Sequence, residues 1–281
     1  MVEYSRILLD ADSIIYKIGF ACDNHQYQYK GKLYEKKKIA TKEWEEDGKP
    51  EEMPIIPIIQ PESKGVVKST LIAFIEDKLE PYKFIDTNLF IGKGRSFRYN
   101  IATRLPYKGN REGRELPTHY EFIKMSIVKM YPTVQSRPGF ESDDEISWMA
   151  REGDLVVSID KDLLQIPAYH YNFDTKQECR VDEFEGIKRV ACQMLVGDTA
   201  DNVLGIGGVG PTSSYLSNIM NAENVQKVFS IVLAVYQTHY GCYSFQFMRE
   251  NFILLRLLRA TPTPYELFFM DRLNINKGYW E

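Results

Sequence analysis

Short apolar runs alternate with stretches of helical periodicity along the first part of the chain. Apolar residues recur at helical spacing in residues 13–21, 67–79 and 122–131. The runs typical of buried strands are RILLD (6–10), NLFIG (88–92), DLVVSID (154–160) and AYHYNF (168–173). Strands that alternate with helices predict an α/β fold with a mainly parallel central sheet flanked by helices.

The pattern becomes almost entirely helical from about Val181 onward. Helical periodicity continues through residues 185–195, 221–237 and 244–259. The sequence therefore predicts an α/β domain over 1–180 and a helical region over 181–281, with 260–281 as a closing tail. Residues 24–62 interrupt the alternation with a hairpin signal, a charged stretch and a proline-punctuated run, so we interpret them as a solvated insertion.

Composition is that of a globular protein outside the membrane. The chain has 281 residues, of which 44% are hydrophobic and 26% charged, enough for one large domain or two modest ones. It shows no signal peptide pattern and no apolar stretch of membrane-spanning length, so the expected location is the cytoplasm. The cysteines are scattered and are interpreted as reduced structural thiols, not zinc ligands or disulfides: Cys22, Cys179, Cys192 and Cys242.

Positive charge is concentrated in one segment, although the net charge is −4. Only Glu112 opposes the cations of this segment. They are Lys93, Arg95, Arg98, Arg104, Lys108, Arg111 and Arg114. Such a run is either a solvated face or a surface for a polyanion, and charge alone leaves both readings open.

Acidic residues gather where predicted strands end or helices begin. Ligands of open parallel sheets bind at the carboxyl ends of the strands. The acids at these places are Asp10, Glu141, Asp143, Asp144, Asp160, Asp162, Asp198 and Asp201. The stretch ESDDE also has a structural interpretation, with Ser142 as the N-cap of a helix and Glu145 completing a capping box.

Eight carboxylates cannot converge without positive charge among them. Hard divalent cations would relieve the repulsion, and Mg²⁺ or Mn²⁺ suits the set better than zinc because it contains no His or Cys. Two such ions about 4 Å apart clamp the attacking and leaving oxygens of a phosphodiester. A basic segment beside such a site predicts a polyanionic substrate.

Two competing interpretations explain less of the sequence. ILLDADS resembles the opening motif of haloacid-dehalogenase-type phosphatases, with Asp10 as nucleophile and Asp12 as acid, but Ile14 stands where that motif has Thr or Ser. The run DNVLGIGGVGPT, residues 201–212, imitates a nucleotide-binding loop. Acids precede it where an apolar strand is needed, and Pro211 takes the place of the phosphate-binding Lys.

The order of the motifs is similar to that of one enzyme family. LLDADSIIY, YKGNR, ESDDE, SIDKDLLQI and GDTADNVLGIGGVG resemble, over residues 6–220, the flap endonuclease and 5′-to-3′ exonuclease family with its PIN-like nuclease fold, most of all its bacteriophage members. The resemblance implies a helix-hairpin-helix variant at 193–220, whose backbone grips duplex DNA and whose carbonyls, those of Ile206 and Val209 here, hold K⁺. Its phosphate-facing residues would be Gly205, Gly207, Gly208, Gly210, Thr212 and Ser213.

The resemblance also assigns roles to the acids and the basic segment. Asp10, Glu141, Asp143 and Asp144 would serve a first metal, and Asp160, Asp162, Asp198 and Asp201 a second. Residues 93–117 would form an arch over single-stranded 5′ ends, mobile until DNA neutralises its charge. Beneath it Lys108 and Arg111 would stabilise the scissile phosphate, and Tyr107 would either stack on a base or pack in the core.

Two positions depart from the family pattern. Gly92 occupies the end of the second strand, where members place a metal-binding Asp, and strand alternation makes Asp12 a doubtful replacement. The Lys expected after Gly-Pro is absent, and Thr212, Ser213 and Ser214 offer only hydroxyls, which predicts weaker duplex binding with less salt dependence.

The sequence thus predicts a monomeric Mg²⁺- or Mn²⁺-dependent 5′ nuclease acting by a two-metal mechanism. Its substrates would be DNA with 5′ ends, flaps or nicks, and RNA primers paired with DNA. The alternative is a branch-binding protein with little or no catalysis, because Gly92 replaces a ligand.

Overall fold

The computed structural model describes residues 3–52, 54–82 and 84–276. The chain forms two compact units, which are described separately. The first comprises residues 1–12, 84–114 and 132–281, and the second comprises 13–83 and 115–131. Residues 277–281 of the predicted closing tail lie outside the described residues.

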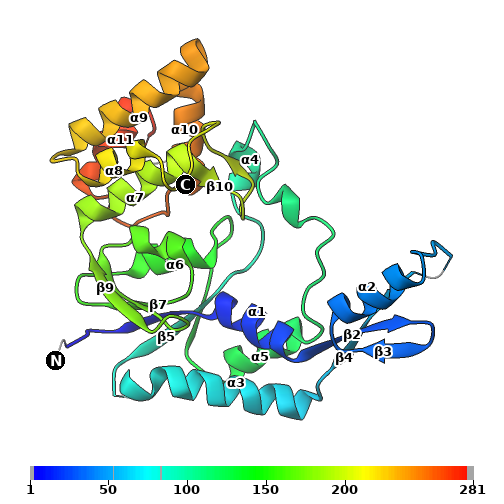
Figure 1. Cartoon of the computed structure of the whole chain (residues 1–281). Helices are drawn as coiled ribbons and strands as arrows, with labels where there is room; N and C mark the ends of the chain where they lie inside the picture. Colours follow the sequence, from blue (N-terminus) through cyan, green and yellow to red (C-terminus); the bar gives the residue numbers. More distant parts are fainter. Residues whose placement is uncertain (1–2, 53, 83, 277–281) are drawn as a thin grey trace. The chain divides into compact units, whose positions relative to one another are not determined.

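A six-stranded sheet organises the first unit, in the order β6-β5-β1-β7-β8-β9. Figure 1 labels β5, β7 and β9 of this sheet. All neighbouring pairs are parallel except β8 and β9, which are antiparallel. The strands are β1 (Ile7–Asp10), β5 (Thr87–Ile91), β6 (Thr133–Gln135), β7 (Leu155–Val157), β8 (Ala168–Asn172) and β9 (Gln177–Val181). The predicted α/β fold with a mainly parallel sheet is confirmed.

The central strand β1 is apolar because it is covered on both faces. Ile7, Leu8 and Leu9 have no exposed surface, which explains a continuous apolar run without polar alternation. Asp10 pairs in register with Phe90 near the end of β5. Because β1, β5 and β7 run in the same direction, their carboxyl ends bring Asp10, Gly92 and Asp160 to one edge of the sheet.

Helix α6 (Ser142–Met149) begins one residue earlier than its capping pattern predicted. Its N-cap is Glu141, whose backbone N–H donates to Asp144 Oδ2 at 3.1 Å. Ser142 is therefore the first helical residue and not the cap. The predicted capping box is wrong at this point, because Asp144 at the third helical position, and not Glu145, returns to the cap.

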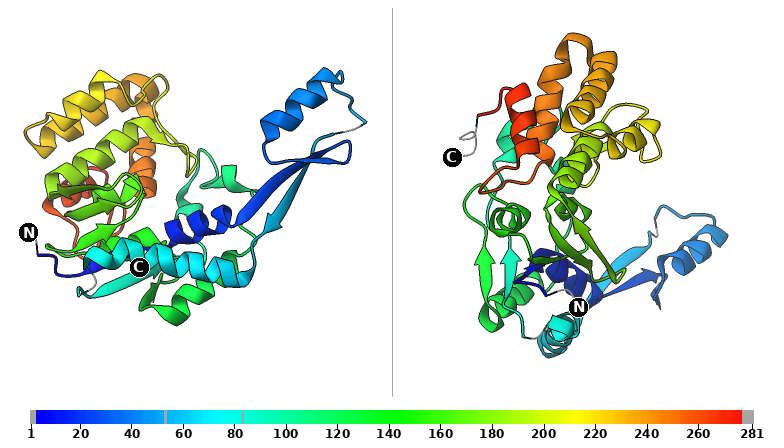
Figure 2. Two further views of the ribbon diagram at one scale, coloured as in Figure 1. Left: turned by 60° about the horizontal axis from the view of Figure 1, so that its bottom comes forward. Right: turned by 90° about the vertical axis from the view of Figure 1, so that its left-hand side faces the viewer.

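The C-terminal part of the first unit is helical, as the pattern predicted. Figures 1 and 2 show its helices grouped together. They are α7 (Glu183–Val196), α8 (Ser214–Met220), α9 (Val225–Tyr240), α10 (Ser244–Leu255) and α11 (Pro264–Arg272). Met194, Val232, Phe252 and Phe269 are fully buried members of the core that they share. Two short antiparallel strands, β10 (Gly197–Asp198) and β11 (Val203–Leu204), lie between α7 and α8 in sequence.

The second unit holds most of α1 (Ala11–Ala21) and the insertion. The insertion is a three-stranded antiparallel sheet, β3-β2-β4, made of β2 (Asp23–Tyr29), β3 (Lys32–Tyr34) and β4 (Ile56–Pro61), with α2 (Lys37–Glu46) packed on it. Lys30 and Gly31 turn the predicted hairpin with positive φ angles of 48° and 76°. In the same unit α3 (Lys64–Leu79) packs on α5 (Tyr120–Met130).

Across the described ranges, no helix combines the length and the apolar character that a bilayer crossing requires.

Candidate active site

Asp10 and Asp160, at the ends of neighbouring strands β1 and β7, are joined by a shared serine. Ser158 Oγ donates to Asp10 Oδ2 at 2.7 Å and accepts from the backbone N–H of Asp160 at 2.9 Å. Asp160 Oδ1 in turn accepts from the backbone N–H of Asp162 at 2.8 Å. Ser158 is buried, and its position two residues before Asp160 was the only sequence signal for this role.

Asp143 lies on the first turn of α6 and faces the strand-end acids. Burial and the negative charges of Asp10, Asp160 and Glu141 raise its pKa well above the ordinary value. These charges act on Asp143 because Asp10, Asp160 and Glu141 lie near it, and Glu141 and Asp143 line one cavity with Asp162. Three of the predicted acidic segments therefore meet in one pocket.

The fourth acidic segment joins the same pocket because its Asp198 lies near Asp162 of the third segment. Burial, Asp160 and Asp198 together raise the pKa of Asp162 to about 8. Gln193 on α7 orients Asp162 by donating from Nε2 to Oδ1 at 2.6 Å, a role that the sequence did not reveal. Asp198 is 3% exposed, and among the described residues its Oδ2 accepts no hydrogen bond, with Lys161 Nζ at 3.9 Å.

Lys108 and Arg111 bring positive charge to these acids. Lys108 has a left-handed backbone with φ of 54°, and its ammonium bonds Glu141 Oε1 and lies 3.7 Å from Asp201 Oδ2. Arg111 Nη2 donates to the other oxygen of Asp201 at 2.7 Å. Burial would lower the pKa of Lys108, but Glu141 and Asp201 outweigh it and raise that pKa.

Asp144 and Arg98 have different places from those predicted. Arg98 Nη1 and Nη2 donate to the two oxygens of Asp144 at 2.6 and 2.8 Å, and both side chains are buried. Burial would raise the pKa of Asp144, yet Arg98 reverses the effect and lowers it. Asp144 is thus committed to an ion pair and not to a metal, and Arg98, 1% exposed on α4 (Arg98–Ile101), cannot contact DNA.

Tyr107 and Arg104 also pack inside the protein. Tyr107 is 2% exposed and its hydroxyl lies within hydrogen-bond distance of Glu141 Oε2 and Asp201 Oδ2, so it cannot stack on a base. Arg104 is half-buried, and its guanidinium donates to Asn251 Oδ1 and to the Leu204 carbonyl. These two residues fix the basic segment instead of presenting it to a substrate.

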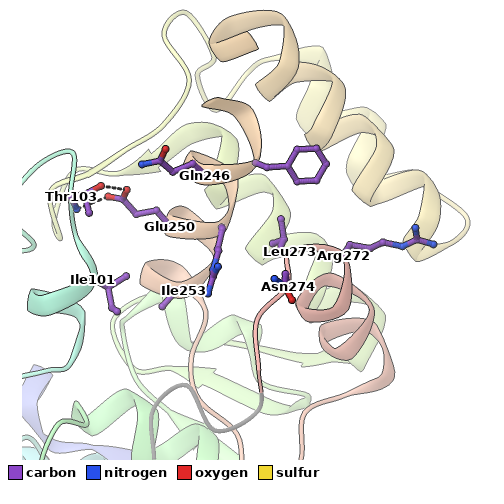
Figure 3. A pocket seen from close by; sticks show the side chains of 10 residues that line it. Ile101, Thr103, Gln246, Glu250, Ile253, Arg272, Leu273 and Asn274 are labelled. Carbon is purple, nitrogen blue, oxygen red and sulfur yellow. Dashed lines mark hydrogen bonds between the residues drawn. The ribbon is translucent and has the colours of Figure 1, made fainter. Parts of the chain in front are cut away.

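The basic segment is hydrogen-bonded to other parts of the first unit at several points. Thr103 bonds both carboxylate oxygens of Glu250 on α10, through its backbone N–H at 2.9 Å and its hydroxyl at 2.5 Å (Figure 3). These two residues are part of the lining of a cavity of about 390 Å³ in the helical region. Further along, the Lys108 N–H donates to the Asp201 carbonyl at 2.9 Å. The exposed cations of the segment are Lys93, Arg95, Arg111 and Arg114.

The glycine run has two kinds of position. A Cβ on Gly205 would lie 2.2 Å from the backbone C and O of Val196, so the glycine permits contact with the end of α7. Around Gly207, Gly208 and Gly210, by contrast, an added Cβ would meet nothing within 4 Å. The backbone of these three glycines is thus open to approach by another molecule.

The other residues assigned to the hairpin are divided between surface and core. Ile206 and Val209 are buried, and the Ile206 carbonyl accepts from the Val209 N–H at 3.0 Å. Thr212 is exposed, and Ser213 Oγ accepts from Tyr215 N at the start of α8. The hydroxyl of Thr212 is therefore open to solvent, and that of Ser213 already caps a helix.

The chemistry of the acidic pocket fits a hard divalent cation. Its donors are carboxylate oxygens, one of them buried without a hydrogen bond. Burial, together with their mutual repulsion, raises the pKa of Asp143 and of Asp162. Across the described ranges, however, no three acidic, His or Cys side chains are gathered tightly enough to hold an ion as they stand. Lys108, bonded to Glu141, occupies part of the space between them.

Comparisons with known proteins give sequence and fold relationships. The chain is 32% identical over 144 residues to DNA polymerase I of Rhizobium leguminosarum, covering 45% of this chain and 14% of that protein. It is 29% identical over 146 residues to a 5′-3′ exonuclease of Mycoplasma pneumoniae, covering 43% of this chain and 49% of that protein. No protein-family model matches the chain.

The fold is similar to that of the T5 D15 protein, which was co-crystallised with metal ions. The TM-score is 0.55, with 16% identity, and the match covers 89% of this chain and 88% of that chain. The chain is therefore similar in sequence to parts of proteins named DNA polymerase I and 5′-3′ exonuclease, and it shares the fold of the T5 D15 protein. It spans less than half the length of each curated relative that it matches.

Proposed function

We propose that the chain is a divalent-metal-dependent nuclease that hydrolyses phosphodiester bonds at 5′ ends, flaps or nicks of DNA, and in RNA primers. The observation that supports this function is the convergence of acids from four distant segments with Lys108 and Arg111. Acids alone would repel a phosphodiester. The same acids with divalent cations and two basic side chains would attract it.

The acids divide into two groups that would each hold one Mg²⁺ or Mn²⁺ ion. Asp10, Glu141 and Asp143 form the first, now without Asp144, and Asp160, Asp162, Asp198 and Asp201 form the second. When bound, the ions would neutralise the carboxylates and stabilise negative charge on the reacting phosphate. Asp160 is exposed and would lie nearest the incoming substrate.

Lys108 and Arg111 would contact the scissile phosphate. Both are within reach of the acids, and Arg111 retains an exposed side chain, 43% accessible. Donors placed where charge develops stabilise the transition state more than the ground state. The exposed Lys93, Arg95 and Arg114 would hold the strand at residues 93–117, in the proposed arch.

The open glycine backbone would grip the duplex part of the substrate. Gly207, Gly208 and Gly210 have no neighbouring atoms in the place of a side chain, so phosphates can approach their N–H groups. Thr212 adds an exposed hydroxyl. A K⁺ ion held by backbone carbonyls near Ile206 and Val209 is part of this proposal, as are the monomeric state, cytoplasmic action and the division into 1–180 and 181–281.

Cleavage of defined substrates tests the function. Flap, nicked and blunt duplexes labelled at the 5′ end are incubated with Mg²⁺, with Mn²⁺ or with EDTA. We expect cleavage only with a divalent ion, and its loss in Asp160→Ala. The exposed Asp174→Ala, on the turn after β8, is the matched control and should cleave like the wild type.

A second function, branch binding without catalysis, is favoured by Gly92. Under it, the wild type binds flap DNA in EDTA and cleaves none of the substrates with either metal. That result would overturn the proposed nuclease function in favour of branch binding without catalysis.

A further inference from the structure

Gly92 and Asp12 occupy adjoining places at the acidic edge of the sheet. Gly92 directly follows β5, and Asp12 lies in the first turn of α1, two residues after the end of β1. The Gly92 backbone N–H donates to Asp12 Oδ2 at 2.9 Å, and Ser142 Oγ donates to the same oxygen at 2.7 Å. Asp12 is thus held against position 92 by two donors.

The Asp12 carboxylate fills the space that a side chain at position 92 would enter. A Cβ built on Gly92 would lie 2.7 Å from Asp12 Oδ2 and 3.7 Å from its Cγ. Real Cβ atoms do not approach an oxygen that closely, so a side chain at position 92 would displace the Asp12 carboxylate from its present place. Gly92 is the residue that makes room for Asp12.

The reason for doubting Asp12 as a replacement does not hold in the structure. It treated residue 12 as part of the strand. The strand ends at Asp10 and α1 begins at Ala11, so a helical turn and not a pleat sets the direction of Asp12.

Asp12 is also connected to acids of the pocket on both sides. Its backbone N–H donates to Asp10 Oδ1 at 3.1 Å. Its carboxylate accepts from Ser142, the residue before Asp143, which faces Asp10 and Asp160. Asp12 therefore belongs to the group of acids around Asp10 and Asp143.

We propose that Asp12 supplies the carboxylate that Gly92 lacks, so that the first metal site takes this acid from the start of helix α1 instead of the end of strand β5. The inference rests on the proposed metal-dependent function. The metal-site carboxylate that position 92 lacks would then come from position 12, which adjoins it in space. This removes the main argument for a binding protein without catalysis.

Metal binding by variants without DNA tests the exchange. Mn²⁺ binding is followed by electron paramagnetic resonance and Mg²⁺ binding by calorimetry, on Asp12→Asn, Asp12→Ala, Gly92→Asp and the double variant Asp12→Ala with Gly92→Asp. Asp12→Asn keeps an oxygen that accepts from Gly92 and Ser142 but loses the charge. We expect it to weaken binding at least about 10-fold, because groups that only orient metal ligands already contribute about 10- to 100-fold.

The double variant tests whether a carboxylate at position 92 can do the work of the carboxylate at position 12. Asp12→Ala opens the space beside Gly92, so an Asp at 92 should recover most of the affinity that Asp12→Ala loses. Gly92→Asp alone crowds two carboxylates and should lower the melting temperature in EDTA.

Two results separate the inference from the function on which it rests. Wild-type affinity in Asp12→Asn, or no recovery in the double variant, would overturn the role of Asp12 alone. A wild type that binds neither ion would overturn the metal-dependent function itself. Asp174→Asn serves as the matched control, and circular dichroism checks that each variant is folded. If Asp12→Ala does not fold, the charge-only change in Asp12→Asn still decides the question.

Discussion

Arg98 and Asp144 form a two-point ion pair with Nη···Oδ distances of 2.6 and 2.8 Å, buried where α4 meets α6. Arg98 also donates to the Leu254 and Arg256 carbonyls at the end of α10. The pair therefore connects the start of the basic segment, the acidic helix and the helical region. The pair positions other groups, and Arg98, which also lines the acidic pocket, holds Glu141 by donating from Nη1 to Oε2 at 3.3 Å.

Breaking this pair should unfold the protein more easily without removing a metal ligand. Arg98→Met leaves Asp144 buried and unpaired, which typically costs about 3–5 kcal/mol. Urea unfolding in EDTA measures the loss in free energy of unfolding. Arg98→Met combined with Asp144→Leu should recover part of it, because no charge then remains uncompensated. A double variant no more stable than Arg98→Met would contradict this account.

Asp143 and Asp144 show how far the sequence could resolve the site. Adjacent acids at a helix start look equivalent in a motif, and both were predicted to bind metal. Arg98, 46 residues before Asp144, decides between them by pairing with one. The strand-end acids needed no such partner, because parallel strands place them at one edge and the apolar runs of β1, β5 and β7 are unmistakable.

The strands that were not predicted lack the continuous apolar run of a buried strand, for physical reasons. β6 has three residues, too few for a period, and β9 is exposed at four of five positions because it is the antiparallel edge of the sheet. Ser158 and Gln193 escaped for a related reason. Each of them has its role because a particular carboxylate lies within hydrogen-bond distance. The packing of distant segments, which the sequence does not show, determines which carboxylate that is.

Lys108 should compete with the first metal ion for Glu141. Its ammonium bonds the carboxylate that the ion would need, so Lys108→Ala should bind Mn²⁺ at least as tightly as the wild type. Cleavage should nevertheless fall about 10²- to 10³-fold, the usual loss for one donor to a developing negative charge. Lys68→Ala, which removes an exposed cation of α3 with no proposed contact to DNA, is the control. Weaker Mn²⁺ binding in Lys108→Ala would show that Lys108 supports the metal site instead.

The metal-free protein should become less stable as the pH rises from about 4 to about 8. Burial, Asp160 and Asp198 raise the pKa of Asp162 to about 8, whereas in the unfolded chain it stays near 3.8. Between these values the folded protein retains a proton that the unfolded chain has released, so the free energy of unfolding falls as pH rises and levels off above about 8. The pKa of Asp143 is raised in the same direction.

Melting temperatures between pH 5 and 9 in EDTA measure this slope. Mg²⁺ should stabilise the protein more at pH 8 than at pH 5, because the ion binds the deprotonated carboxylates. Asp162→Asn should flatten the slope in EDTA. A melting temperature in EDTA that rises steadily from pH 5 to 8 would contradict the crowding of acids in the pocket.

Gly205 and Gly207 separate the structural from the binding role of the hairpin. Gly205→Ala places a Cβ 2.2 Å from the Val196 backbone, which cannot yield as a flexible side chain does. Overpacking of this kind costs about 1–3 kcal/mol, so urea unfolding should shift to lower concentration.

Gly207→Ala meets nothing within 4 Å and should leave stability unchanged. Its methyl group would instead obstruct a phosphate at the backbone, so duplex affinity, measured by fluorescence anisotropy in EDTA, should fall. Equal duplex binding by Gly207→Ala and the wild type would mean that DNA phosphates do not approach the hairpin at this position.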